Sequence, residues 1–142
     1  FDETQRNAYP MGDSIRLLRW QSDVDRLYAA ADVAVLTSDN EGMPVSLIEA
    51  SLAGLPSVTT AVGSAGEVVI DGVTGRVVAP SAQQVADALL EILSDQEMRL
   101  VMGEAARQRA ERAYGVSRLV KDHEDLYRRL IGEHTQTASK DC

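Results

Sequence analysis

The sequence predicts an α/β domain in which a parallel sheet is flanked by helices. Short runs rich in apolar and β-branched residues, at positions 33–36, 56–60 and 76–79, are typical of strands that a parallel sheet buries on both faces. Segments with helical spacing of apolar residues alternate with these runs, as in parallel βαβ units. The 142 residues fit one domain, and 44% hydrophobic content with only 4% aromatics predicts a core of Leu, Val, Ile and Ala. The expected sheet is Rossmann-like.

The other elements follow from capping and turn residues. A helix is expected over residues 44–53, with Pro44 at its first position and Gly54 just beyond its end. Asp71 and Gly72 predict a turn after a short helical or extended segment. The remaining predicted elements are a strand at 15–20 and helices at 24–31, 82–93, 96–112 and 117–131. We expect residues 1–132 to form the domain and residues 133–142 to be a disordered tail.

Composition excludes several classes of partner. The net charge of −8 argues against nucleic acid, because proteins that bind it usually carry a basic face. His123, His134 and Cys142 are isolated in the sequence, so no metal site is predicted, and His123 is expected to be structural. A single cysteine excludes an intrachain disulfide and fits a reducing compartment. A cytoplasmic location is therefore expected, with peripheral contact to a membrane left open.

The ligand site of such a sheet lies beyond the carboxyl ends of its strands. Two polar or glycine-bearing loops, at 37–43 and 61–66, leave those ends, so the site is expected between them. Gly63 follows a strand, but Ala61 occupies the position where a dinucleotide-binding fingerprint would have its first glycine. No cofactor is therefore predicted, and the loop around Gly63 is expected to form a wall of the site.

Two glutamates stand out beside the helix at 44–53. Glu41 lies just before the helix, whose N-terminal N–H groups are suited to an anion, and Gly42 would let a ligand approach the backbone. Glu49 follows inside the helix among apolar residues. A carboxylate there needs a partner, and sugar or ribose hydroxyls would be suitable donors. Alternatively, Glu49 is merely exposed on the outer face of the helix with Ser46 and Ala53, and periodicity leaves both hypotheses open.

The order of these features resembles a known family, the retaining GT-B-fold glycosyltransferases of family 4, also called glycosyl transferases group 1. The resemblance covers nearly the whole chain, from residue 15 to residue 131. Its clearest mark is the pair Glu41 and Glu49, which matches the family's Glu-x7-Glu motif. The other matching stretches are 31–38, 42–44, 54–56, 62–64, 67–69 and 71–75. By this resemblance the chain is the nucleotide-sugar-binding, C-terminal half of a GT-B fold.

The resemblance also implies roles for individual residues. Glu41 would contact the transferred sugar as the catalytic candidate, and Glu49 would bind the ribose hydroxyls. The backbone around Gly42, Met43 and Pro44 would face the sugar and the diphosphate. The remaining donor-binding candidates are Ser38, Asn40, Gly63, Trp20 and Gln21, the last two near the nucleobase. The implied reaction is metal-independent transfer from a UDP-, GDP- or ADP-sugar with retention of configuration.

Parts of the family's enzymes are not represented in this sequence. Two strands of the donor domain would precede Phe1, and a separate N-terminal domain would bind the acceptor, a glycan or a lipid-linked molecule. We therefore expect a partial domain that is inactive alone, with an open edge on the strand at 33–36. Two other hypotheses stay open, because fold does not fix function. One is a non-catalytic module that binds a nucleotide sugar or a partner, and the other is another enzyme of this fold, such as a sugar-nucleotide epimerase.

Overall fold

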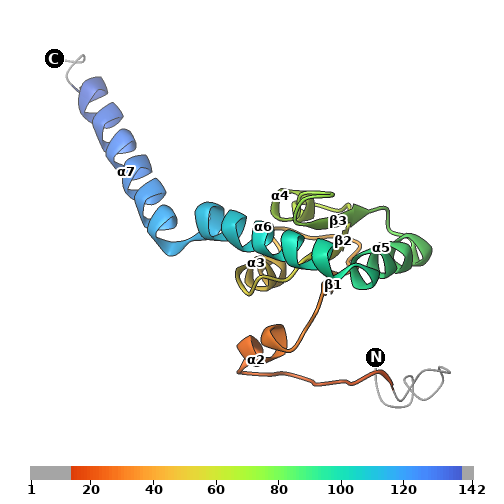
Figure 1. The fold of residues 1–142 in the computed structure, drawn as a ribbon. Coiled ribbons are helices and arrows are strands. Elements are labelled where there is room, and N and C mark those ends of the chain that lie inside the picture. The colour runs from red at the N-terminus through yellow and green to blue at the C-terminus, as the bar shows by residue number, and fades with distance from the viewer. Residues whose placement is uncertain (1–13, 139–142) are drawn as a thin grey trace.

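A computed structural model describes residues 14–138, in which three parallel strands form a sheet between helices (Figure 1). The elements are α2 (Val24–Ala29), β1 (Ala34–Leu36), α3 (Val45–Leu52), β2 (Ser57–Thr60), α4 (Ala65–Val68), β3 (Gly75–Val78), α5 (Ala82–Ser94), α6 (Gln96–Tyr114) and α7 (Val116–Ala138). The strand order is β1-β2-β3, with both pairs parallel. This arrangement confirms the predicted α/β class.

Helices cover both faces of the sheet. On one face, α3 and α4 bury a cluster of Leu47, Ala65, Val68 and Val69, against which Leu36 of β1 packs. On the other face, α5 and α6 bury a cluster formed by Val58, Ala88, Ile92 and Met102. The apolar side chains of successive strand residues point to opposite faces, so continuous runs rather than alternating ones are what this sheet requires.

The sheet ends at β1 within the described residues. Val35 lies on the face that α5 covers elsewhere, yet its side chain is 46% exposed because α5 packs on β2 and β3. An open edge on this strand was expected from the sequence, and the described residues confirm it.

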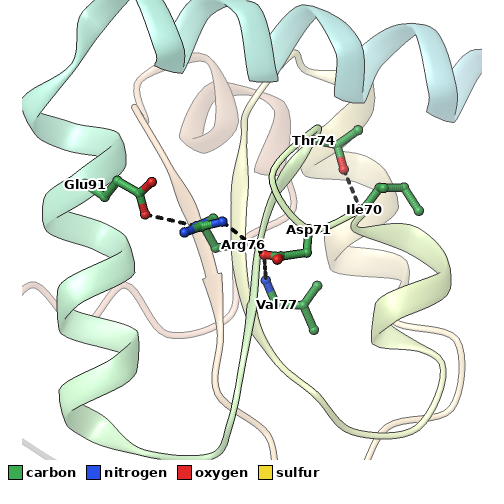
Figure 2. A network of polar contacts seen from close by, with 6 residues as sticks. All are labelled: Ile70, Asp71, Thr74, Arg76, Val77 and Glu91. Carbon is green, nitrogen blue, oxygen red and sulfur yellow. Dashed lines mark hydrogen bonds and ion pairs between the residues drawn. The ribbon is translucent and has the colours of Figure 1, made fainter.

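Side chains close the opposite edge, at β3 (Figure 2). The Asp71 carboxylate accepts a hydrogen bond from the Val77 N–H, with the two atoms 3.0 Å apart. Farther along the same edge, the Gln84 side-chain carbonyl accepts the Ala79 N–H at 3.1 Å. Since unpaired strand N–H groups invite pairing with another chain, these two contacts protect β3.

Asp71 also forms an ion pair with Arg76, and replacing Asp71 should lower the stability of the domain. The Asp71 Oδ1 lies 3.6 Å from Arg76 Nη1, and Arg76 Nε lies 2.9 Å from Glu91 Oε2 (Figure 2). We expect Asp71→Ala to lower the free energy of unfolding by about 1 kcal/mol, the usual net contribution of one hydrogen bond. Urea denaturation measures this. Asp122→Ala is the control, because Asp122 pairs with Arg118 on the exposed surface of α7 and should change stability by less than about 0.5 kcal/mol. An equal effect of both changes would contradict the assigned role of Asp71.

The predicted strand at 15–20 is wrong. The structure assigns no strand to this segment, and Arg19 adopts a φ of 55°, which breaks an extended run. A strand needs a neighbour to receive its hydrogen bonds, and no strand of the described residues lies beside this segment.

Several helix ends also differ from the prediction. α2 stops at Ala29 rather than at residue 31, and α7 continues to Ala138 instead of ending at Ile131. A glycine inside a helix costs only about 1 kcal/mol, so Gly132 does not terminate α7. The predicted tail therefore begins inside a helix, and residues 139–142 lie outside the described residues.

α7 extends away from the body of the domain (Figure 1). His123, which was expected to be structural, is exposed on it, and its Nδ1 lies 2.8 Å from the Leu119 carbonyl oxygen of the same helix. Among the described residues, none of the helices combines the length and the apolar character that crossing a lipid bilayer requires.

Candidate functional site

The two predicted loops leave the same edge of the sheet, because β1 and β2 are parallel neighbours. A hydrogen bond connects the end of β2 with the loop after β1. The Thr60 hydroxyl, at the end of β2, donates to the Ser38 carbonyl oxygen at 2.7 Å. The end of one strand thus fixes the loop that follows the other. Thr60 is buried, so this contact is shielded from water.

Ser38 in turn holds the first glutamate. Its hydroxyl donates to Glu41 Oε1 with the two oxygens 2.6 Å apart, which is typical of a hydrogen bond to a carboxylate. Both side chains are half-buried, whereas Asn40 between them is exposed. Thr60, Ser38 and Glu41 therefore form a chain that orients one carboxylate at the carboxyl edge of the sheet.

Gly63 brings the second loop against Glu41. Its φ is 48°, and a Cβ atom built on it would lie 1.7 Å from the Glu41 carbonyl oxygen. No residue with a side chain fits at that distance. The structure therefore gives Gly63 a packing role beside Glu41, in addition to the donor contact that was predicted for it.

The helix that follows Glu41 begins one residue later than predicted. Pro44 is the N-cap of α3 rather than its first residue, with φ −75° and ψ 99°. Its carbonyl oxygen accepts the N–H groups of Leu47 at 3.1 Å and Ile48 at 3.4 Å. Because the proline has no N–H, the donors at this helix end belong to the residues after it, and they point out of the helix toward its start.

Glu49 is exposed on the outer face of α3, as the second of the two sequence hypotheses predicts. It nevertheless has a protein partner, because the Tyr28 hydroxyl donates to Glu49 Oε2 at 3.1 Å. The same hydroxyl lies 3.3 Å from the Ser46 carbonyl oxygen. Burial, together with the hydrogen bond and the charge of Glu49, raises the pKa of Tyr28, so the phenol remains a donor at neutral pH.

The two ends of the site open into different hollows. One, of about 400 Å³, is lined by residues of α2 and α3, including Tyr28, Glu49 and Leu52. The other, of about 840 Å³, is bordered by Met43 and by residues of α3, α4, α6 and α7. Met43 and Glu49 therefore border different hollows, Met43 just before α3 and Glu49 within it.

The structure does not bring two predicted residues, Trp20 and Gln21, to the site. Trp20 is 85% exposed, and the Gln21 side-chain amide donates to the Leu18 carbonyl oxygen within its own segment. Figure 1 shows the segment before α2 running at a distance from the sheet. Gly42 is exposed, and a Cβ atom there would meet no heavy atom within 4 Å, which leaves room for a ligand.

Sequence reasoning missed two residues that support the glutamates. Tyr28 donates a hydrogen bond to Glu49, and Thr60 donates one to Ser38, which in turn holds Glu41. Tyr28 counted only as an apolar position of a helix, although a tyrosine hydroxyl usually finds a partner when its ring packs. Thr60 counted only as a β-branched strand residue. In both cases the side-chain hydroxyl, rather than the apolar part of the side chain, was the feature that indicated a contact in the site.

Similarity to known proteins identifies the family of this chain. Residues 3–109 match the family described as "Glycosyl transferases group 1". The chain belongs to this family. It is 32% identical over 116 residues to the N-acetyl-alpha-D-glucosaminyl L-malate synthase of Bacillus anthracis, covering 81% of this chain and 30% of that protein. It is 36% identical over 130 residues to the D-inositol 3-phosphate glycosyltransferase of Salinispora tropica, covering 89% and 27% respectively. The chain thus spans less than a third of the length of these group 1 relatives.

Two solved structures have the same fold as this chain. The sucrose-phosphate synthase of Thermosynechococcus elongatus superposes with a TM-score of 0.86 at 28% identity, over 92% of this chain and 34% of that one. HepE of Anabaena, solved in complex with UDP-glucose, gives a TM-score of 0.82 at 24% identity, over 87% and 35%. These matches confirm the GT-B-type fold, and the family match confirms a glycosyl transferase group 1 domain.

Proposed function

We propose that this chain is the donor-binding part of a family 4 glycosyltransferase that transfers a sugar from a nucleoside-diphosphate sugar with retention of configuration. The observation that carries the proposal is the arrangement of two carboxylates around the start of α3. Ser38 orients Glu41 just before the helix, and Tyr28 holds Glu49 farther along it. A scaffold that binds no ligand has no need to orient both.

Each part of this arrangement suits one part of a nucleotide sugar. Carboxylates accept hydrogen bonds from hydroxyls, so Glu41 would bind the sugar and Glu49 the ribose. The N-terminal N–H groups of α3 lie between the two carboxylates along the chain and would bind the diphosphate. The same fold accommodates UDP-glucose in HepE.

The proposed reaction breaks the bond between the anomeric carbon and the diphosphate oxygen. The diphosphate leaves with the electron pair, the acceptor hydroxyl adds to the same face of the sugar, and the proton of that hydroxyl passes to the departing diphosphate oxygen. The dipole of α3 would stabilise the negative charge that develops on the departing diphosphate. Glu41 would hold the sugar so that its anomeric carbon stays at the helix end.

Calorimetry on the full-length protein tests this proposal with two variants. We expect Glu49→Gln to weaken UDP and UDP-glucose equally, roughly tenfold, because both ligands carry the ribose and a hydrogen bond to a charged group contributes about 1.5 kcal/mol or more. We expect Glu41→Gln to weaken UDP-glucose only. GDP- and ADP-sugars are tested in parallel, and the base that binds replaces uridine in these comparisons.

Glu97→Gln is the matched control, because Glu97 lies in the first turn of α6, outside both loops. It should bind like the natural protein. Equal losses of both ligands in Glu41→Gln and Glu49→Gln would contradict the separate roles. Binding without any transfer or hydrolysis of the sugar would favour the non-catalytic module instead.

A further inference from the structure

We propose that Tyr28 is a positioning residue, which holds the Glu49 carboxylate in the orientation that receives the ribose hydroxyls of the donor. This inference rests on the proposed function and adds to it a residue outside the family's pair of glutamates. It assigns α2 a part in nucleotide selection.

The contact is a bridge between two helices. Tyr28 lies on α2, and Glu49 and Ser46 lie on α3. The phenol hydroxyl is 3.1 Å from Glu49 Oε2 and 3.3 Å from the Ser46 carbonyl oxygen. A hydroxyl has a single hydrogen, so it is shared between these two acceptors or donated to the nearer one, the carboxylate. Either way, one oxygen of Glu49 is fixed relative to the helix backbone.

An exposed glutamate benefits from such a contact. Ordering a free glutamate side chain costs rotamer freedom, and a ligand that must order it binds more weakly. Because Tyr28 already holds Oε2, that cost is met before the ligand arrives. A tyrosine hydroxyl is protonated at neutral pH, and burial together with Glu49 raises the pKa of Tyr28 further, so the donor persists.

A purely structural role is the main alternative. α2 has no buried residue, and Tyr28 is one of its two half-buried side chains, so the tyrosine also attaches α2 to α3. The two roles predict different results. Loss of a structural contact would weaken every nucleotide alike, whereas loss of positioning would weaken only ligands that use Glu49.

The test therefore compares ribose with deoxyribose. Dissociation constants for UDP, 2′-deoxy-UDP and 3′-deoxy-UDP are measured by calorimetry in the full-length protein, or for the GDP or ADP series if that base binds. We expect the natural protein to prefer the ribonucleotide at least tenfold. In Tyr28→Phe, which keeps the ring and removes the hydroxyl, this preference should fall at least threefold, while binding of the deoxynucleotides changes little.

Two further variants separate the causes. In Glu49→Gln the preference should nearly vanish, and adding Tyr28→Phe to it should have no further effect, because the tyrosine acts through Glu49. Tyr127→Phe is the control, since Tyr127 is exposed on α7 and should leave the preference unchanged.

The outcomes are distinguishable. If Tyr28→Phe weakens ribonucleotides and deoxynucleotides alike, or adds fully to Glu49→Gln, the positioning role is overturned while the proposed function stands. If the natural protein binds no nucleoside diphosphate, both the proposed function and this inference fail.

Discussion

Replacing Gly75 with alanine is expected to destabilise the domain by about 3 kcal/mol or more. Gly75 begins β3 and pairs with Ser57 of β2, where its φ is 154°, a conformation that residues with a side chain rarely adopt. A Cβ atom there would lie 1.9 Å from the Ser57 carbonyl oxygen. Backbone strain costs about 1–3 kcal/mol, and forcing apart packed backbone adds about 1–3 kcal/mol. Because a domain is stable by only about 5–15 kcal/mol, this is a large part of the total.

Urea denaturation of the chain, followed by circular dichroism, measures the loss. Gly66→Ala is the matched control, because a Cβ atom at Gly66 would meet no heavy atom within 4 Å. We expect that change to stay within about 0.5 kcal/mol of the natural protein. A similar midpoint for Gly75→Ala and the control would show that β2 and β3 can separate without cost, contrary to the packing described above.

The sequence predicts the middle of the fold well, and physical reasons explain why. β1, β2 and β3 each contain a run that is apolar or β-branched without alternation, and both faces of the sheet are covered where β2 lies. Runs of this kind fit a strand that is buried on both faces better than they fit an exposed element. The segment at 15–20 also contains apolar residues but has no neighbouring strand among the described residues, so its apolar content alone misled the prediction.

The candidate site could also be predicted only in part. Glu41, Ser38 and Gly63 were predicted together, and the structure does bring them together, because loops that follow parallel strands meet at one edge. The bridge from Tyr28 to Glu49 could not be predicted in the same way. It depends on how α2 packs against α3, which periodicity within each helix does not specify.

Gly63→Ala is expected to have the largest effect on donor binding. The added methyl group would lie 1.7 Å from the Glu41 carbonyl oxygen, and the φ of 48° further disfavours a side chain. One of the two loops must move, and either movement displaces the carboxylate that Ser38 holds. If Glu41 binds the sugar as proposed, the loss of a charged hydrogen bond should weaken UDP-glucose roughly ten- to a hundredfold, with a smaller effect on UDP.

Gly63 is exposed, but Ala65 two residues later is buried in the core, so the fold and the site are followed by separate measurements. Calorimetry with UDP and UDP-glucose reports the site, and circular dichroism reports the fold, with Glu97→Gln again as the control. A variant that keeps its fold but loses discrimination for the sugar would support the role of Glu41. A variant that keeps the natural affinity for UDP-glucose would mean that Glu41 tolerates displacement. The sugar contact would then have to come from another residue of the loop, such as Asn40, which is exposed at the same edge of the sheet.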